Sequence, residues 1–317
     1  MRIIFAGTPD SAIPSLRALV KSEHEVVAVI TRPDSSSGRG QISAPSPVAQ
    51  IADELGIRVL KHANLREPRI REELTQLNPD VIAVVAYGAL VPSELLTLPR
   101  FGWINLHFSL LPAWRGAAPV PYAIRFGDEI TGATTFQIDE GLDTGPVFGV
   151  VTETIKLDDT STSLLARLSV SGARLLVQTL SGVSGGQLRP ELQRLDEISH
   201  APKITADDCQ IDWRQPALAI ERQIRAFTIE PGAWTSYAGD RIQIGPVEIL
   251  PTILDGKPGE IIASKHEVMV ISGSQTLRLG RVKAAGKREM LAADWARGRR
   301  VQLGEAFSVT KSSANDG

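Results

Sequence analysis

Residues 81–107 read VIAVVAYGALVPSELLTLPRFGWINLH, a stretch that holds two apolar, β-branched runs separated by a loop. The runs at 81–86 and 102–107 predict strands, because they are short and are bounded by turn-forming residues. The alternation continues toward the N-terminus, where strands are expected at 2–5 and 25–30 and helices at 11–20, 47–55 and 67–77. Strands that alternate with helices predict an α/β fold with a doubly wound, mostly parallel, Rossmann-like sheet.

The pattern changes after two more predicted strands, at 133–138 and 147–154, and a helix at 162–180. The segment 181–208 is rich in Gly, Pro and polar residues and is expected to be a linker. Beyond it, a helix at 216–227 precedes short alternating runs at 234–237, 241–244, 247–250, 268–271 and 277–282. Such runs predict a small β-barrel or sandwich. A chain of 317 residues is long enough for two domains, which we place at 1–204 and 205–310, followed by a polar tail at 311–317.

Composition excludes several classes of protein. The single cysteine, Cys209, cannot form an intrachain disulfide, which favours a reducing compartment, and we expect a cytoplasmic protein. The longest apolar stretch, 81–91, is about half of what a bilayer span needs, so no membrane partner is expected. Neither G-x-G-x-x-G nor a phosphate-binding P-loop is present, and the histidines lack metal-ligand spacing, so neither a nucleotide cofactor nor a metal is expected. No self-complementary stripe is evident, which favours a monomer.

One predicted strand carries an amide and an imidazole on the same face. Because side chains alternate along a strand, Trp103, Asn105 and His107 share one side, near the carboxyl end where doubly wound sheets bind ligands. An Asn amide can donate to a developing oxyanion, and a His can move a proton near pH 7 because its ordinary pKa is about 6.5. An isolated His is more often structural, but this position and this neighbour favour a catalytic pair.

The loop DEGLDTGP at 139–146 offers a third catalytic group. A carboxylate beside an imidazole fixes its tautomer and stabilises its protonated form. We select Asp143, although Asp139 and Glu140 lie in the same loop. An acid in a Gly-rich turn is about as often a turn cap as a catalytic group, so the pairing of Asp143 with His107 is a hypothesis at this point.

Two segments carry positive charge. The long Gly/Ser/Pro segment at 31–47 contains Arg39, and long loops inside compact domains are usually functional or disordered. Residues 278–300 hold eight Lys or Arg against two acids. On charge alone, a solvated face is the more frequent interpretation of such a segment and a polyanion site the less frequent one.

Several motifs together resemble a known family. They are FAGTPD at 5–10, GRG at 38–40 with PSPV at 45–48, AYGALVP at 86–92, NLHFSLLPAWRGAAPV at 105–120, DEGLDTGPV at 139–147, and RAF at 225–227 with PGAW at 231–234. In this order they resemble the methionyl-tRNA formyltransferases, which are folate-dependent enzymes. The three candidate catalytic residues alone would match every folate-dependent formyltransferase. The WRGAAP block, the GRG loop and PGAW are the motifs that narrow the resemblance to the methionyl-tRNA formyltransferases.

The resemblance implies transfer of the formyl group of 10-formyltetrahydrofolate, a co-substrate, to the α-amino group of methionyl initiator tRNA. It implies a catalytic domain at 1–204 and a tRNA-binding barrel of the oligonucleotide-binding type at 205–310. The family's catalytic residues match Asn105, His107 and Asp143. Its folate-contacting stretch matches Ser109, Leu110, Leu111 and Pro112. The residues that we expect to contact tRNA are Arg39, Arg281, Lys283, Lys287 and Arg288.

Two other functions remain open from the sequence. A formyltransferase acting on a small amine, such as a sugar or a nucleotide, would use the same three residues with a different acceptor. A non-catalytic RNA-binding protein is the second alternative, and the presence of all three candidate catalytic residues argues against it.

Overall fold

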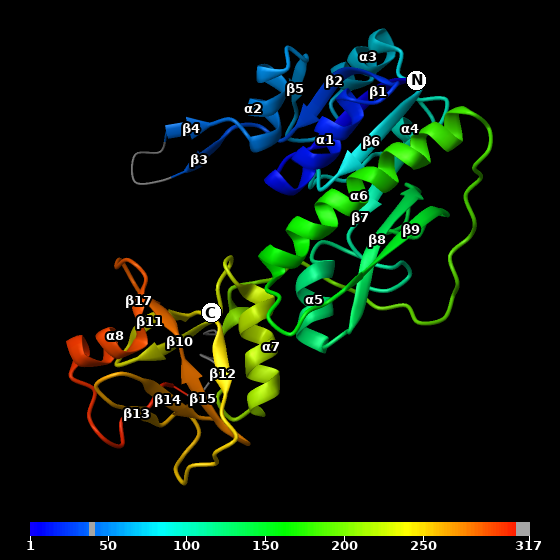
Figure 1. Cartoon of the computed structure of the whole chain (residues 1–317). Helices are drawn as coiled ribbons and strands as arrows, with labels where there is room; N and C mark the ends of the chain where they lie inside the picture. The colour runs from blue at the N-terminus through cyan, green and yellow to red at the C-terminus, as the bar shows by residue number, and fades with distance from the viewer. Residues whose placement is uncertain (38–41, 309–317) are drawn as a thin grey trace, which may run out of the picture. The chain divides into compact units, whose positions relative to one another are not determined.

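The computed structural model describes residues 1–37 and 42–308 and divides the chain into two compact units (Figure 1). The first unit contains 1–119, 130–154 and 165–202, and the second contains 120–129, 155–164 and the chain from 203 onward. We call them the first and second domains. The chain passes between them more than once before residue 203, so each domain is built from separate stretches of sequence.

Seven strands form the sheet of the first domain, in the order β5-β2-β1-β6-β7-β8-β9. They are β1 (Arg2–Gly7), β2 (Glu25–Thr31), β5 (Val59–Lys61), β6 (Val81–Val85), β7 (Trp103–His107), β8 (Ile130–Gln137) and β9 (Val147–Thr154). The first five strands in the sheet order run parallel, whereas β8 is antiparallel to both of its neighbours. β6 is buried along its whole length, as expected of a strand covered on both faces. The predicted doubly wound, mostly parallel sheet is confirmed.

The four helices predicted for this domain are present with boundaries shifted by a few residues, and α4 (Ser93–Leu96) was not predicted. The helices of the domain are η1 (Asp10–Ala12), α1 (Ile13–Val20), α2 (Pro47–Glu54), α3 (Pro68–Leu77), α4 and α6 (Ser161–Ser184), whose residues from 165 onward belong to the domain. At the start of α2, Ser46 Oγ accepts a hydrogen bond from Ala49 N at 3.1 Å, and Pro47 occupies the first turn. The long segment before α2 contains a short hairpin, β3 (Ser35–Ser37) and β4 (Ile42–Ala44), that the sequence did not predict.

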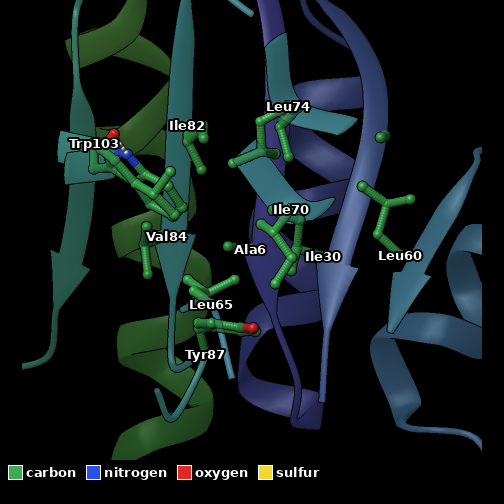
Figure 2. Packing of buried hydrophobic residues seen from close by; sticks show 13 residues of the cluster. Ala6, Ile30, Leu60, Leu65, Ile70, Leu74, Ile82, Val84, Tyr87 and Trp103 are labelled. Carbon is green, nitrogen blue, oxygen red and sulfur yellow. Dashed lines mark hydrogen bonds between the residues drawn. The ribbon is translucent and has the colours of Figure 1, made fainter. Parts of the chain in front are cut away.

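One face of the sheet packs against α3. Ile4 of β1 is buried in a cluster with Ile70 and Leu74 of α3, and Trp103 of β7 belongs to the same cluster (Figure 2). The indole Nε1 of Trp103 also donates to the carbonyl oxygen of Leu95 at 2.8 Å, which satisfies the ring's only polar group inside the core.

The opposite face of β7 packs against α6. A Cβ added at Gly172 of α6 would lie 3.0 Å from Leu106 Cδ2, so this position brings the helix close to the strand. Because side chains alternate along a strand, Asn105 and His107 lie on the other face, the one that carries Trp103. The sheet therefore separates the two candidate catalytic side chains from α6.

The second domain contains two antiparallel sheets of four strands, in the orders β10-β11-β16-β17 and β12-β15-β14-β13. Its strands are β10 (Trp234–Tyr237), β11 (Asp240–Ile244), β12 (Val247–Ile249), β13 (Ile261–Ala263), β14 (Val268–Ile271), β15 (Thr276–Leu279), β16 (Arg281–Ala284) and β17 (Met290–Leu291). Its helices are α5 (Pro119–Phe126), of which Pro119 belongs to the first domain, η2 (Asp207–Cys209), α7 (Ala217–Phe227) and α8 (Ala292–Arg299). The expected smaller β-domain after the parallel sheet is confirmed.

The prediction of one strand at 277–282 is wrong. The chain leaves one sheet after Leu279 and enters the other at Arg281. Gly280 lies at the transition, where an added Cβ would stand 3.0 Å from the carbonyl oxygen of Pro246. A continuous apolar alternation cannot reveal such a change of sheet, because β15 and β16 each keep the alternation on their own side of Gly280.

Aromatic rings form the core of the second domain. The ring of Phe307 stacks on Trp213 with centroids 5.5 Å apart and on Trp295 with centroids 5.6 Å apart. Tyr237 and Trp295 form a T-shaped pair with ring centroids 5.2 Å apart. Such pairs add about 0.5–1.5 kcal/mol each beyond the burial of their area.

The expected linker at 181–208 is wrong over its first part. α6 continues to Ser184, and residues up to 202 belong to the first domain. The backbone groups of Glu191 and Val147 exchange hydrogen bonds at 2.7 and 2.8 Å, and Arg115 N donates to Ser199 O at 2.9 Å. Polar composition predicted a connecting segment, but these backbone pairs tie it to the sheet and to the loop after β7.

Candidate active site

A cavity of about 460 Å³ lies at the carboxyl ends of β6 and β7. Residues 86–91, which follow β6, contribute to its lining, together with Asn105, His107, Leu142 and Asp143. All of these residues belong to the first domain. The structure therefore brings the three predicted catalytic residues to one cavity at the predicted edge of the sheet.

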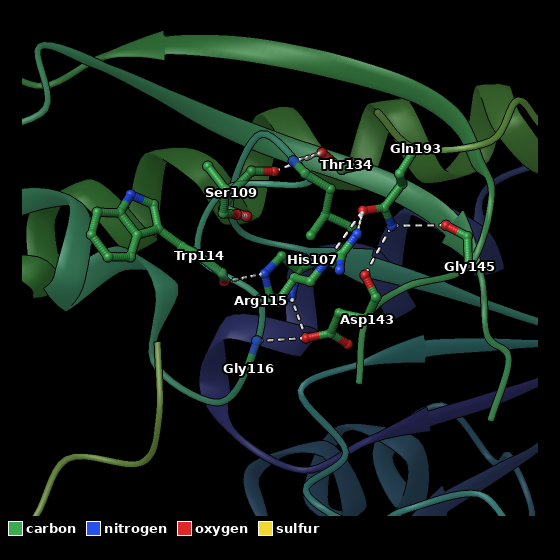
Figure 3. A network of polar contacts seen from close by, with 11 residues as sticks. His107, Ser109, Trp114, Arg115, Gly116, Thr134, Asp143, Gly145 and Gln193 are labelled. Atoms are coloured by element: carbon green, nitrogen blue, oxygen red, sulfur yellow. Dashed lines mark hydrogen bonds and ion pairs between the residues drawn. The ribbon is translucent and has the colours of Figure 1, made fainter. Parts of the chain in front are cut away.

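Both ring nitrogens of His107 face hydrogen-bond acceptors. Nε2 donates to the carbonyl oxygen of Trp114 at 2.9 Å, and Nδ1 lies 3.6 Å from Oδ2 of Asp143 (Figure 3). The side chain is 6% exposed. Burial lowers the pKa of His107 below its ordinary value of 6.5, although the charge of Asp143 and the hydrogen bond to Trp114 act in the opposite direction. The neutral ring that carries its proton on Nε2 leaves Nδ1 as a base beside a carboxylate.

Asp143 is held beside the imidazole by the loop after β7. Its Oδ2 accepts a hydrogen bond from Gly116 N at 2.7 Å. Asp139, an alternative in the same loop, instead accepts from Gly141 N at 3.0 Å and from Thr144 Oγ1 at 2.7 Å, so it caps the turn. The carboxylate that meets the imidazole is therefore that of Asp143.

Three residues around the cavity adopt the left-handed backbone conformation without being glycine. They are Ala86 (φ 48°), Trp114 (φ 57°) and Asp143 (φ 53°). Such conformations cost about 1–3 kcal/mol each and gather at functional sites, where the surrounding structure maintains them. Each of these residues either lines the cavity or contacts His107 directly.

The carboxamide of Asn105 offers an unused acceptor. Its Oδ1 is buried and has no hydrogen-bond partner within residues 1–37 and 42–308. An unsatisfied buried polar atom costs about 1–3 kcal/mol. The side chain lines the cavity, so a rotation of its amide would present this acceptor to a donor of a bound molecule and relieve the cost.

The four residues expected to contact folate form the turn after β7. Ser109 Oγ donates to Ala113 O at 2.6 Å, while Thr134 Oγ1 donates to Ser109 O at 2.6 Å and accepts from Leu111 N at 3.2 Å. Ser109, Leu110, Leu111 and Pro112 are not among the residues that line the 460 Å³ cavity. These hydrogen bonds stabilise the turn that leads to Trp114, and folate contact by this turn stays a prediction.

The second domain brings four predicted tRNA-contacting residues to a second cavity, of about 540 Å³. Its lining includes Arg281, Lys283, Lys287 and Arg288. Arg281 Nε lies 2.7 Å from Glu289 Oε2, while the other three form no ion pair within the described ranges. The remaining predicted residue, Arg39, lies outside the described residues.

Ion pairs reduce the charge of the rest of the basic segment. Arg278, Arg297 and Arg299 each pair with an acid of the same domain. Of the four basic residues of this segment without an ion pair in the described ranges, Lys283, Lys287 and Arg288 line the 540 Å³ cavity and Arg300 does not, a distribution that the count over 278–300 could not show.

Sequence reasoning missed the groups that hold the catalytic side chains in place. The acceptor for His107 is the backbone carbonyl of Trp114, and the donor to Asp143 is the backbone N–H of Gly116. Backbone groups carry no residue-specific signal. Gln193, whose side chain bonds the Asp143 loop, lies in the segment that composition assigned to a linker. The contribution of 86–91 to the cavity was indicated only by its position after a central strand.

No group of three or more His, Cys, Asp or Glu side chains is arranged to hold a metal ion in the part of the chain that the structure describes. In the same part, no helix combines the length and the apolar character that crossing a membrane requires.

Family models account for most of the chain. The model described as "Formyl transferase" matches residues 1–180, and the model described as "Formyl transferase, C-terminal domain" matches residues 203–300. The chain belongs to the formyl transferase family. The matches place the 460 Å³ cavity in the first matched region and the basic cavity in the second.

One curated relative and two solved structures show which individual proteins the chain is similar to. The chain is 55% identical over 307 residues to the methionyl-tRNA formyltransferase of Thermobifida fusca, with 97% of this chain and 99% of the relative covered. The solved methionyl-tRNA formyltransferase from Clostridium thermocellum has a TM-score of 0.57 at 18% identity and covers 86% of this chain and 99% of its own. An N-formyltransferase from Helicobacter canadensis, solved with folinic acid and dTDP-3-aminofucose, has a TM-score of 0.67 at 18% identity, with 87% and 98% covered. At such identities the two solved structures establish the shared fold.

The state of His107 predicts the pH dependence of formyl transfer. If neutral His107 is the base, kcat at saturating substrates falls as the pH drops through the pKa of His107 in the substrate complex. In the substrate-free protein, burial lowers this pKa below 6.5. Asp143 raises this pKa, so Asp143→Asn lowers it further and moves the acid limb of the kcat profile to lower pH. Stopped assays across a pH series measure the shift, and ionisation of the substrate amine affects wild type and variant alike. If the acid limb of the kcat profile of Asp143→Asn stayed in place or moved to higher pH, the pairing of Asp143 with His107 would be contradicted.

Proposed function

We propose that this chain transfers the formyl group of 10-formyltetrahydrofolate to the α-amino group of methionyl initiator tRNA and acts in the cytoplasm. The observation that carries the chemistry is the approach of His107 Nδ1 to Asp143 Oδ2, at 3.6 Å, in the cavity that Asn105 lines. The near full-length identity to a methionyl-tRNA formyltransferase supports the acceptor. The small-amine alternative is supported only by distant solved structures, so it is not favoured.

The residues around the cavity suit a formyl donor. The segment 86–91 supplies apolar side chains that can cover a flat ring, and the unpartnered Oδ1 of Asn105 needs a donor from a bound molecule. When bound, the folate supplies an activated one-carbon group at the oxidation level of formate. We propose Asn105, His107 and Asp143 as catalytic residues and Ser109–Pro112 as folate-contacting residues.

Asn105 is proposed to bind both reacting groups through its carboxamide. Oδ1 can accept from the attacking amine, while Nδ2 can donate to the formyl oxygen as negative charge develops there. One such donor typically contributes about 3–4 kcal/mol to transition-state stabilisation. A side chain that is already at the cavity and has an unsatisfied acceptor needs no rearrangement of protein hydrogen bonds at Oδ1 to do this.

His107 and Asp143 are proposed to move the proton. Nδ1 accepts it from the attacking amine, since Nε2 already donates to Trp114 O. The resulting Nδ1–H points to Oδ2 of Asp143, whose charge stabilises the imidazolium. His107 then returns the proton to the leaving nitrogen. The buried neutral ring thus begins the reaction in the form that a base requires.

The direct test supplies the purified chain with 10-formyltetrahydrofolate and charged methionyl initiator tRNA and measures formylmethionine released from the tRNA. A parallel reaction offers a dTDP-linked amino sugar instead. We expect formylation of the tRNA and none of the amino sugar. Formylation of the amino sugar alone would refute the proposed acceptor, and no transfer to either would refute the proposed reaction.

The basic cavity of the second domain predicts a selective effect on tRNA. In Lys283→Ala/Lys287→Ala, KM for tRNA is expected to rise about tenfold, because fewer phosphates are neutralised. For the same reason, the slope of log KM against log salt concentration is expected to decrease by about 1–2. Steady-state kinetics at several salt concentrations provide the measurement. The charge-matched control is Lys257→Ala/Lys265→Ala, which alters exposed residues outside this cavity. An equal rise of KM for folate would instead assign the two lysines to the stability of the fold.

A further inference from the structure

We propose that Gln193 is a positioning residue, one that holds Asp143 beside His107 by linking the loop 139–146 to Arg115. The inference rests on the proposed function, because it concerns the geometry of the same site. Gln193 lies in the segment that sequence composition predicted to be a linker, and it does not line the 460 Å³ cavity. Its effect on catalysis must therefore pass through the residues that it contacts.

Both ends of the Gln193 carboxamide are engaged. Nε2 donates to the carbonyl oxygen of Asp143 and to that of Gly145, each at 2.8 Å. Oε1 accepts from Arg115 Nη2 at 2.6 Å and from Nε at 3.2 Å. Figure 3 shows the amide between the guanidinium on one side and the two carbonyl groups on the other. The Gln193 side chain thus joins the Arg115 guanidinium in the loop after β7 to two backbone carbonyls in the loop 139–146.

The two loops that Gln193 joins are the ones that hold the proposed catalytic pair. Arg115 lies between Trp114, whose carbonyl accepts from His107, and Gly116, whose N–H donates to Asp143. Arg115 is 7% exposed, so its position is fixed by packing and by the bond to Gln193. The loop of Asp143 is anchored to the same arginine through the Gln193 amide. Loss of the hydrogen bonds of Gln193 is therefore expected to change the distance between the Asp143 carboxylate and the His107 imidazole.

Backbone strain explains why an external anchor is needed. Asp143 adopts φ 53°, a conformation that a non-glycine residue leaves readily unless it is restrained. Two residues further on, Gly145 allows the close return of the chain, since an added Cβ would stand 1.7 Å from Gln137 O. The two bonds from Gln193 Nε2 are accepted by the carbonyls of these two residues. They therefore restrain the segment that sets the direction of the Asp143 carboxylate.

Gln193→Glu removes the hydrogen bonds to the Asp143 loop and keeps those to Arg115. A glutamate can still accept from Arg115, so the buried guanidinium keeps a partner, but it has no N–H for the carbonyls of Asp143 and Gly145. We expect kcat for formyl transfer to fall about 10- to 100-fold with the KM values for both substrates within about twofold, because a small misplacement near the reacting groups is costly. Arg194→Ala, which removes the neighbouring exposed ion pair with Asp196, is the control and should retain wild-type kcat.

The pH profile distinguishes positioning from a structural role. The groups that face His107 are the Asp143 carboxylate, the Trp114 carbonyl and the ring of Phe136, whose centroid is 6.4 Å away. Asp143 is the charged one among them. In Gln193→Ala, departure of the carboxylate should move the acid limb of kcat to lower pH, in the same direction as Asp143→Asn. Combined with Asp143→Asn, Gln193→Ala should add little further shift, because both changes remove the same interaction.

The outcomes separate this inference from the proposed function. Wild-type formylation with unchanged kcat and acid limb in both Gln193 variants would overturn the inference alone. Loss of activity in both Gln193 variants in proportion to a lowered melting temperature, with no shift of the limb in Gln193→Ala, would also overturn it and make Gln193 a stability residue. Should Gln193→Ala not fold, Gln193→Glu decides by kcat at an unchanged melting temperature, because its added negative charge acts on the pKa of His107 in the opposite direction and its limb is not used. Absence of wild-type formylation would remove both proposals together.

Discussion

His107→Ala is expected to lower kcat for formyl transfer by about 10² to 10⁴, the usual contribution of a positioned acid-base group. The reason is that the buried ring presents Nδ1 as a base beside Asp143, with Nε2 already donating to Trp114. Alanine removes the proton acceptor and leaves the amine to lose its proton to water. Single-turnover rates with prebound substrates measure the chemical step apart from tRNA binding and product release.

Two controls make this experiment specific. His107→Gln can keep a side-chain donor for Trp114 O but cannot take up a proton, so it should be nearly as slow as His107→Ala while melting closer to wild type. His266→Ala changes an exposed histidine of the second domain and should leave the rate unaltered. A His107→Gln enzyme with near wild-type turnover would exclude His107 as the base and reduce its role to a hydrogen bond.

Asn105→Ala is expected to lower kcat by about 10² to 10³ without lowering the free energy of unfolding. The loss of rate follows from removal of the amide that we assign to the formyl oxygen and the amine. The retained stability follows from the buried, unpartnered Oδ1, whose removal relieves a cost of about 1–3 kcal/mol. Denaturant unfolding of the substrate-free protein and steady-state kinetics at saturating substrates give the two quantities.

The opposite behaviour is expected at a structural asparagine. Asn64 Oδ1 accepts from Arg66 N at 2.9 Å on the surface of the first domain, so Asn64→Ala should lose a little stability and no activity. If Asn105→Ala unfolded more easily and kept its rate, the amide would be a structural group and the cavity would have to perform its chemistry without it.

Regular elements could be predicted because their signals are local. The strand at 103–107 has a side-chain period of two, so its sequence already places Asn105 and His107 on one face. The parallel sheet follows from strands alternating with helices, and its ligand-binding edge follows from topology. Short strands at 234–237 and 268–271 were predicted with the boundaries that the structure has.

Other features depend on contacts between distant residues. The change of sheet at Gly280 depends on the approach of Pro246, and the first part of the expected linker is ordered by Val147 and Arg115. No pattern within 277–282 or 181–202 encodes those neighbours. The contact of His107 with Asp143 rather than with Asp139 is likewise a tertiary property, because Asp143 has a left-handed backbone and lies beside the imidazole whereas Asp139 caps the turn.

The sequence by itself determined which chemical groups are present and on which strand two of them lie, because side-chain identity and alternation are properties of the local chain. It also indicated the family, since its motifs occur in a fixed order. Only the tertiary structure decided that Nδ1 of His107 faces Asp143, that Asn105 has an unsatisfied buried oxygen, and that Gln193 joins the two loops. The physical reason is that these properties arise from burial and from backbone groups brought together by folding. Every residue has such backbone groups, and their partners lie far away along the chain.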